Sequence, residues 1–475
     1  MVYNFVMSFN TVTFFIFLIL AFTLYWSVNN KYRLAVLLIL NAIFYLFGTS
    51  YWIVLVCLIL ISYLSALKID KLEGKNRKII FIISIIICLL PLLLLKYWNF
   101  TISLFNSSLP RLNIVAPLGI SFFTFEIISY LVDVYRGMDA EKDLLCYGAY
   151  VSFFPNISSG PIERAKHLLP LLKQEKHFDY NQASYGLKLF AWGLFKKFVV
   201  ADNIARYIDP IFARSQRYYG LILVIAIVIY PIQIYADFSG YSNMVSGIAR
   251  LFGIDLVDNF KAPYFSNSMK EFWSKWHISL SSWLKDYVYI PLGGNRKGRI
   301  RKYINLITTF VISGLWHGAS INYLIWGLLH GLLQVIEDLI PFTKKKSDKF
   351  SWFEMFVLYG ILCVTFIFFR CETFTKAIHF LNPLNLITYF SRDNLSLYFV
   401  KGFKDLRIET LDLFVLLATI IIMIIYDYYY TKKIDLIESV SRLNTIPRWI
   451  VYIVFVLLIV YLSFKGTGTF IYTNY

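Results

Sequence analysis

The chain has 475 residues, of which 58% are apolar and 19% aromatic, and this composition excludes an ordinary soluble domain. The formal net charge is +17, but Lys and Arg gather in short stretches between apolar runs, where they bias membrane topology rather than indicate nucleic-acid binding. We therefore expect an all-α polytopic membrane protein with roughly eleven or twelve transmembrane helices plus re-entrant pieces.

The cysteines indicate neither a disulfide framework nor a metal site. They stand singly, several of them within apolar runs, and none has the spacing of a zinc or redox motif. We expect no disulfide bond and no metal. The five are Cys57, Cys88, Cys146, Cys363 and Cys371.

Residues 1–115 contain four apolar spans and almost no polar residue at membrane depth, which predicts a scaffold. No Lys or Arg precedes the first span, whereas Lys31 and Arg33 follow it, and no small-residue cleavage site is evident. This pattern predicts a retained first helix with an extracytoplasmic N-terminus.

From residue 116 onward, polar residues interrupt the apolar pattern. Pro155, Gly160 and Pro161 forbid a continuous helix, and broken backbone at membrane depth is tolerated only where protein or a water-filled cavity surrounds it. Asp237 follows a long apolar run, so its carboxylate either caps or pairs within the structure or lines a substrate path.

The stretch 266–331 differs most from its surroundings, since it holds His277, His317 and His330, half of all the histidines. If the basic residues at 301–302 mark one membrane face, a helix places His317 about 15 residues further, or about 22 Å into the hydrocarbon layer. An ionisable ring at that depth is a candidate site. On position alone, a packing histidine between close helices is an equal alternative.

Two repeats of Gly-x-x-His-Gly, at 314–318 and 327–331, favour the site. Each glycine pair clears space around an imidazole, and a substrate needs space beside a buried base. If the helix continues from His317, His330 lies about 20 Å away on roughly the opposite side, so the two rings cannot share one ligand.

The last part of the chain, residues 346–475, alternates apolar spans with polar connections. An extracytoplasmic loop is expected at about 371–409, where it either docks a partner or acceptor sugar or only connects two spans. The final span leads outward from the basic stretch 432–448, which places the C-terminus outside the cytoplasm as well.

Three phrases in the middle of the chain resemble the membrane-bound O-acyltransferase family, in the branch that O-acetylates bacterial polysaccharides. They are Glu271-Phe-Trp-Ser-Lys-Trp-His-Ile-Ser-Leu-Ser, Tyr289-Ile-Pro-Leu-Gly-Gly-Asn-Arg and Gly314-Leu-Trp-His-Gly-Ala. The resemblance runs from about Pro117 to the C-terminus. It implies helices around a central tunnel, with residues 116–345 as catalytic core and 346–475 as C-terminal helices with an extracytoplasmic loop and tail.

The resemblance makes His317 the catalytic histidine and His277 its supporting polar position. A general base must be uncharged, and burial away from acids favours the uncharged imidazole. His277 either hydrogen-bonds the donor or polarises its thioester carbonyl, or it caps and packs a helix. The tunnel and substrate candidates are Trp316, Trp276, Asp237 and Ser313; for the tryptophans, aromatic core packing is the alternative.

The basic loop between residues 285 and 302 suits the phosphates of acetyl-CoA, the donor that the resemblance implies, because Lys and Arg bind phosphate by charge-assisted contacts. Its donor-binding candidates are Lys285, Arg296, Lys297 and Arg299. Cytoplasmic loops are generally basic, and for any single residue topology alone is the favoured explanation. Acetyl-CoA is a substrate here, and no cofactor is expected.

Tyr472 lies in the tail that follows the last span, a tail similar to the ending of the polysaccharide branch. We hypothesise that it accepts the acetyl group and passes it to an extracytoplasmic acetyltransferase partner. The alternative is an aromatic anchor at the membrane interface.

The predicted function is transfer of acetyl groups from cytoplasmic acetyl-CoA across the cell membrane for O-acetylation of an exported polysaccharide. D-alanyl transfer to teichoic acid from a carrier-protein thioester is the variant within the family. A transporter of polysaccharide or lipid-linked sugar, or a structural membrane subunit, would be a different class of protein.

Overall fold

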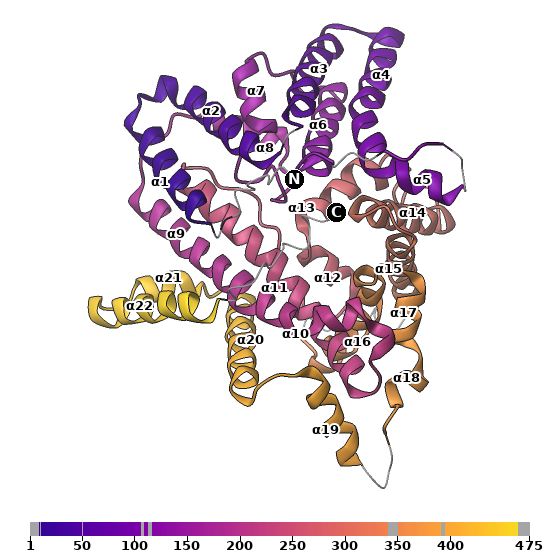
Figure 1. The fold of residues 1–475 in the computed structure, drawn as a ribbon. Helices are drawn as coiled ribbons and strands as arrows, with labels where there is room; N and C mark the ends of the chain where they lie inside the picture. Colours follow the sequence, from indigo (N-terminus) through magenta and orange to yellow (C-terminus); the bar gives the residue numbers. More distant parts are fainter. Residues whose placement is uncertain are drawn as a thin grey trace. The chain divides into compact units, whose positions relative to one another are not determined.

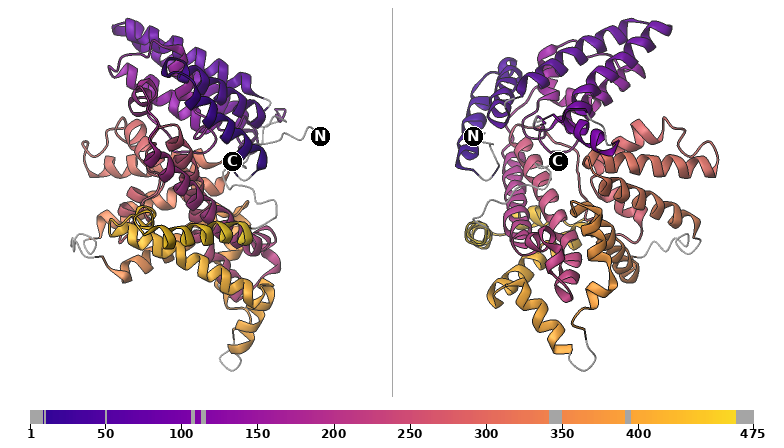
Figure 2. Two further views of the ribbon diagram at one scale, coloured as in Figure 1. Left: turned by 90° about the vertical axis from the view of Figure 1, so that its left-hand side faces the viewer. Right: turned by 45° about the vertical axis from the view of Figure 1, so that its right-hand side comes forward.

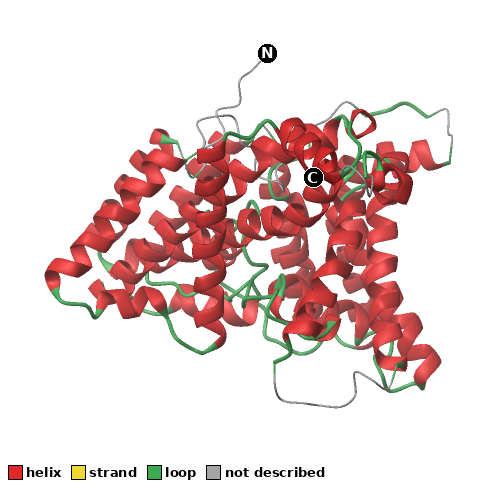
Figure 3. Cartoon of the chain, turned by 90° about the horizontal axis from the view of Figure 1, so that it is seen from below, coloured by secondary structure: helices red, strands yellow, loops and turns green. Residues whose placement is uncertain are grey.

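The computed structural model describes residue 9 and residues 11–49, 51–105, 109–112, 116–340, 350–390 and 395–463. In these ranges the regular structure is helical and contains no strand, as Figures 1 and 3 show, which confirms the all-α prediction. Among the described helices, seven are long and apolar enough to cross a membrane, so the chain is polytopic. The seven spans are Asn30–Gly48, Trp52–Lys71, Gly74–Leu104, Leu221–Leu251, Trp352–Arg370, Thr410–Thr431 and Thr445–Leu462.

The chain divides into two compact units. The first unit takes the residues up to Phe190 together with Ser242–Asp258, and the second takes Ala191–Tyr241 and the residues from Asn259 onward. The chain passes between them within α9 (Tyr180–Leu194) and within the long helix α11 (Leu221–Leu251).

The first unit contains short loops and polar N-caps between apolar helices. Thr11 and Asn29 cap the first two helices through their side-chain oxygens, which satisfies backbone N–H groups that the helix leaves free. Figure 2 shows the paired helices α3 and α4 side by side. The helices are α1 (Val12–Ser27), α2 (Asn30–Gly48), α3 (Trp52–Lys71), α4 (Gly74–Leu92), the π-helix η1 (Leu93–Tyr97), α5 (Trp98–Leu104), α6 (Ile120–Tyr135), α7 (Leu144–Val151), α8 (Ala165–Lys173) and most of α9.

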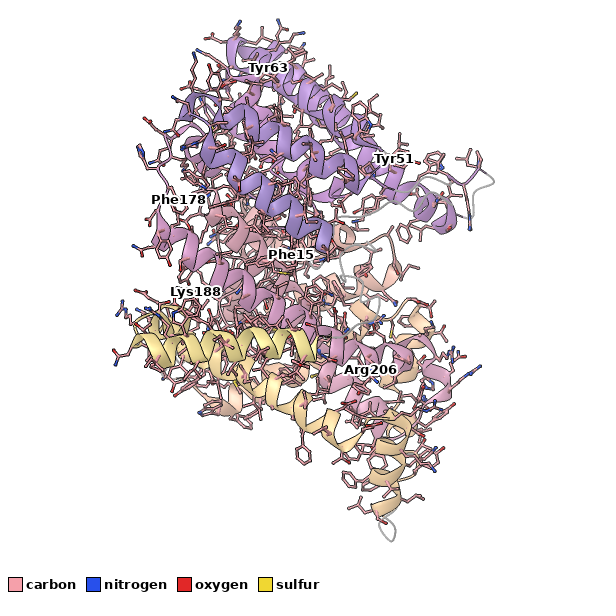
Figure 4. The ribbon with its side chains drawn as sticks, turned by 60° about the vertical axis from the view of Figure 1, so that its left-hand side comes forward. Phe15, Tyr51, Tyr63, Phe178, Lys188 and Arg206 are labelled. Atoms are coloured by element: carbon pink, nitrogen blue, oxygen red, sulfur yellow. The ribbon has the colours of Figure 1, made fainter. Side chains whose placement is uncertain are left out.

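Aromatic side chains pack α1 against α9 and against the residues just before α9. The ring of Phe15 meets that of Phe190 edge-on at 6.0 Å, and the ring of Phe178 meets that of Trp26 at 5.4 Å. Figure 4 labels Phe15 and Phe178 on these two segments. Such pairs add stability beyond their buried area.

The predicted break at residues 155–161 is confirmed, because this segment is irregular and buried. Its backbone depends on two buried carboxylates. Glu126 of α6 accepts hydrogen bonds from the Asn156 amide and the Glu163 N–H, both at 3.1 Å. Glu163 in turn accepts from the Val257 N–H at 2.7 Å and bonds the His167 ring at 2.7 Å. Within the segment, turn hydrogen bonds from Asn156 and Ile157 to the Phe153 carbonyl and from Gly160 to the Asn156 carbonyl satisfy backbone N–H groups.

The hydrogen bond that the Glu163 carboxylate accepts from the His167 ring raises the pKa of His167 above its ordinary value. The His167 side chain is half-exposed, whereas its carboxylate partner lies in the protein interior.

The second unit contains the remaining helices and the histidine-rich stretch. They are the π-helix η2 (Phe195–Ala201), α10 (Asp202–Ala213), the 3-10 helix η3 (Ser215–Arg217), most of α11, α12 (Met269–Lys275), α13 (Ile278–Leu284), the π-helix η4 (Lys285–Tyr289), α14 (Arg299–His317), α15 (Ile321–Leu339), α16 (Trp352–Arg370), α17 (Phe374–Leu381), α18 (Pro383–Ile387), α19 (Leu395–Leu406), α20 (Thr410–Thr431), α21 (Leu436–Ser441) and α22 (Thr445–Leu462).

Helices α14 and α15 form a close hairpin joined by residues 318–320 (Figure 1). A methyl group on Gly314 would overlap the Tyr323 carbonyl, and one on Gly327 would overlap the Phe310 carbonyl. The glycines therefore let the two backbones touch, as small residues do between membrane helices. We expected them to clear space for a substrate, but the neighbouring helix occupies that space.

Asp237 forms a buried ion pair in the interior of this unit. Its carboxylate lies 2.6 Å from the Lys197 ammonium, which also contacts the Asp202 carboxylate at 2.7 Å. Of the two roles that the sequence left open for Asp237, these contacts correspond to structural pairing. Partnered charges are the form in which ionisable groups persist inside a membrane protein.

Candidate active site

His277 sits at a sharp turn between α12 and α13, immediately before the first residue of α13. Its backbone adopts the left-handed conformation (φ 44°, ψ 53°), which is uncommon for a residue with a side chain. Asn259 holds this turn, because its carbonyl accepts from the Ile278 N–H at 3.0 Å and its side-chain oxygen accepts from the Ser279 N–H at 3.3 Å.

The ring of His277 is completely buried and has contacts on several sides. Its Nδ1 lies 3.0 Å from the side-chain oxygen of Asn259, and the ring of Phe238 meets it edge-on at 4.6 Å between centroids. The ring is therefore oriented by one hydrogen bond and by aromatic packing from α11.

His317 is the last residue of α14, and its ring lies near the ring of His277. The side chain is 3% exposed and contacts the rings of Trp326 and Phe369, each at 5.1 Å. The centroids of the His317 and His277 rings lie 6.3 Å apart. The two histidines singled out in the sequence are thus neighbours, although forty residues of chain separate them.

The tryptophan candidates differ in how close they come to this pair. The Trp316 ring lies 5.8 Å from the His277 ring and belongs to the site. Trp276 packs against Phe260 at 5.1 Å and Phe272 at 5.4 Å, inside an aromatic cluster. Trp276 therefore contributes packing behind the turn that carries His277.

His330 lies much closer to His317 than the sequence suggested. The helix ends at His317 and the chain reverses, so the premise of a continuous helix was wrong. The rings of His330 and His317 both contact Trp326, at 4.7 and 5.1 Å. His330 is fully buried, and among the described residues its two ring nitrogens have no hydrogen-bond partner.

A cavity of about 1180 Å³ lies within the second unit, near His277 and His317. Three of the predicted donor-binding residues line it, namely Lys285, Arg296 and Lys297, whereas Arg299 is not among the lining residues. Lys270 and Lys302 add further positive charge, against two carboxylates, Glu337 and Asp338. The cavity is therefore predominantly cationic, which favours an anionic ligand.

The deeper lining of the cavity approaches both histidines. Ile278, the residue after His277, and Ser313, one helical turn before His317, both line it, although neither imidazole does so itself. The Ser313 hydroxyl is buried and has no hydrogen-bond partner within the described part of the chain. A ligand in the cavity would thus lie one residue from His277 and one turn from His317.

Two further predictions concern a metal and the C-terminal tail. In the described ranges, no three His, Cys, Asp or Glu residues come close enough together to hold a metal ion. Tyr472 lies outside the described residues, so the acyl relay assigned to it stays a prediction.

Sequence reasoning missed Asn259 and Phe238, and it placed His330 too far from His317. Asn259 lies eighteen residues before His277 with no motif to connect them, and only the folded chain brings its amide to the ring. The repeated Gly-x-x-His-Gly phrase around His330 was a usable signal, but its meaning depended on where the helix ends.

The sequence profile of the membrane-bound O-acyltransferase family matches residues 140–379, a range that includes both histidines and the whole cavity lining. This chain belongs to the membrane-bound O-acyltransferase family. As a family member it is a membrane-embedded acyltransferase, which confirms the resemblance drawn from its three phrases.

Relatives within the family include three kinds of named enzyme. The probable alginate O-acetylase AlgI of Pseudomonas syringae pv. tomato is 35% identical over 370 residues, covering 75% of this chain and 71% of the relative. The peptidoglycan O-acetyltransferase of Helicobacter pylori is 32% identical over 424 residues, 80% of each chain. The teichoic acid D-alanyltransferase of Bacillus subtilis is 29% identical over 297 residues, covering 59% of this chain and 72% of the relative.

Proposed function

We propose that this acyltransferase moves acetyl groups from cytoplasmic acetyl-CoA across the cell membrane for O-acetylation of an exported polysaccharide. The observation that carries the proposal is a pair of buried imidazoles, 6.3 Å apart, beside a cationic cavity. The names of the alginate and peptidoglycan relatives support a polysaccharide acceptor and an acetyl group. Membership of an acyltransferase family favours this function over a transporter or a structural subunit.

His317 acts as the general base in this proposal. It takes the proton of the acceptor hydroxyl, the hydroxyl oxygen bonds to the acyl carbon, and the carbon–sulfur bond breaks. The proton ends on the departing thiolate, so the reaction balances as ester plus thiol. A positioned base contributes about 10²–10⁴-fold to such a step, and the aromatic walls around His317 exclude water from it.

The cationic lining binds the phosphates of the donor, and the apolar, deeper lining receives its pantetheine arm. Lys285, Arg296 and Lys297 supply charge-assisted contacts to phosphate. A carrier-protein thioester presents the same arm with one phosphate, and the D-alanyltransferase relative keeps that donor as the second candidate. In that case the protein would D-alanylate teichoic acid.

The remaining parts of the proposal concern the outer face. Tyr472 supplies the acceptor hydroxyl of the first step, at His317, and holds the acetyl group as a phenyl ester. A nucleophile of an extracytoplasmic acetyltransferase partner then attacks that ester, the phenol of Tyr472 leaves with a proton, and the partner completes transfer to the polysaccharide. Both termini lie outside the cytoplasm, as the distribution of Lys and Arg predicts, and the protein resides in the cell membrane.

Purified protein in proteoliposomes, supplied with radiolabelled acetyl-CoA, a hydroxyl acceptor and the partner enzyme, tests the function. We expect His317→Ala to lower ester formation at least about 10²-fold. His177→Ala, on an exposed histidine, is the matched control and should behave as wild type. Acetylation that survives His317→Ala would show that His317 is not the general base. Activity with a D-alanyl carrier thioester but not with acetyl-CoA would show that the carrier thioester is the donor.

A further inference from the structure

The side-chain oxygen of Asn259 receives three hydrogen bonds at the turn that carries His277. The Ser279 N–H donates at 3.3 Å, the Ser279 hydroxyl lies at 2.9 Å, and the His277 Nδ1 lies at 3.0 Å. A backbone N–H can only donate, so the amide atom that faces it must be the oxygen and not the NH₂ group. This contact fixes the orientation of the Asn259 amide.

The orientation of the amide determines which nitrogen of His277 carries the proton. An oxygen acceptor requires Nδ1 to be the donor, and in a neutral imidazole the other nitrogen, Nε2, then has the free lone pair. Nε2 is buried and has no hydrogen-bond partner among the residues that the structure describes. The rings of Phe238 and Trp316, at 4.6 and 5.8 Å, restrict the ring that presents this nitrogen.

We propose that Asn259 is a positioning residue that holds His277 in its Nδ1–H form, so that Nε2 accepts a hydrogen bond from a substrate O–H or N–H. This inference rests on the proposed function. It excludes one of the three roles that the sequence left open for His277, polarisation of the thioester carbonyl, because a nitrogen without hydrogen cannot donate to that oxygen. His277 therefore orients a donor group of the substrate, such as a neighbouring sugar hydroxyl or a pantetheine amide, while His317 takes the reacting proton.

Nitrogen-15 NMR of the full-length protein, labelled at histidine and placed in bilayers, reports the tautomer directly. His277→Gln identifies the signals of this ring among the six histidines by their disappearance. We expect a protonated Nδ1 and an unprotonated Nε2 in wild type, and a mixture of tautomers in Asn259→Ala. A wild-type ring protonated at Nε2, or a spectrum unchanged in Asn259→Ala, would overturn the proposal. This measurement needs no acyl donor, so it stands even if acetyl-CoA proves to be the wrong substrate.

Kinetics separate positioning from a merely structural role. Asn259→Ala should lower kcat/KM by about tenfold or more, because a histidine in the wrong tautomer loses its function. Asn259→Asp keeps an acceptor oxygen and should restore most of the activity and the Nδ1–H signal. Ser279→Ala removes another hydrogen bond to the same oxygen without touching the ring, and should stay within about threefold of wild type.

Equal losses in Ser279→Ala and Asn259→Ala would assign Asn259 to holding the turn and refute the positioning role. The substrate partner of Nε2 follows from which Michaelis constant changes in Asn259→Ala. A rise in KM for acetyl-CoA identifies a donor N–H, and a rise in KM for the acceptor identifies a hydroxyl.

Discussion

The close α14–α15 hairpin predicts a loss of stability when a single methyl group is added at either of two of its glycines, but not at a glycine of α16. A Cβ on Gly314 would lie less than 3.0 Å from the Tyr323 carbonyl, a distance that real Cβ atoms essentially never show. A Cβ on Gly331 would lie 2.9 Å from the Cα of Ile307, and one on Gly360 of α16 would meet nothing within 4 Å. Gly314 and Gly331 are buried between the two helices, whereas Gly360 is exposed, so Gly360→Ala serves as the control without a steric cost.

The magnitudes follow from two opposing effects. Alanine gains about 1 kcal/mol over glycine inside a helix, whereas overpacking costs about 1–3 kcal/mol. We expect Gly314→Ala to lower the free energy of unfolding by about 2 kcal/mol, Gly331→Ala to lower it by about 1 kcal/mol because the Ile307 backbone must shift, and Gly360→Ala to raise it by up to about 1 kcal/mol.

Thermal unfolding midpoints in one detergent, together with initial acylation rates, test this order. Because Gly314 lies three residues before His317, its alanine variant should also lose activity, whereas Gly360→Ala should remain fully active. A Gly314→Ala protein as stable and active as wild type would refute the packing argument. So would equal destabilisation at Gly360, since nothing there opposes a methyl group.

Three further predictions concern charged groups. Lys297→Glu should raise KM for acetyl-CoA about three- to tenfold with little change in kcat, as loss of a charge-assisted phosphate contact predicts, whereas Arg299→Glu should not. Asp237→Asn should lower the free energy of unfolding by about 1–3 kcal/mol and lower the unfolding midpoint accordingly. The reason is that Lys197 then keeps only one of its two buried carboxylate partners. Below pH 6, His167→Gln should lower the free energy of unfolding by up to about 1 kcal/mol, and with it the unfolding midpoint, because the half-exposed ring stabilises the fold as a cation.

The sign of the last prediction follows from linkage. The folded-state pKa of His167 is raised, so its contribution is complete below the unfolded value and disappears as pH rises through the folded value. A His167→Gln effect that grows with pH would contradict it. Equal changes in KM for acetyl-CoA in Lys297→Glu and Arg299→Glu would contradict the phosphate contact assigned to Lys297. An unchanged unfolding midpoint in Asp237→Asn would contradict the ion pair assigned to Asp237.

The helices and the candidacy of His317 followed from local signals in the sequence, whereas His277 was paired with it through the family resemblance. Long apolar runs predict helices, and an ionisable ring within such a run indicates a site. What the sequence could not give was contact between distant segments. His330 lies near His317 because the chain reverses over the three residues after His317, which the sequence pattern did not predict. The roles of Lys197 and Asn259 depend on partners that are distant in the sequence and that no helical periodicity predicts.

His277 and His317 lie at helix ends, and this position explains how a polar site exists inside an apolar protein. His277 precedes α13 and His317 ends α14, so each ring sits where helical hydrogen bonding stops and other groups must replace it. Asn259 supplies the replacement at His277, and aromatic rings with the close α15 backbone enclose His317. The packing and the chemistry therefore use the same residues, and changes to the hairpin should alter stability and activity together.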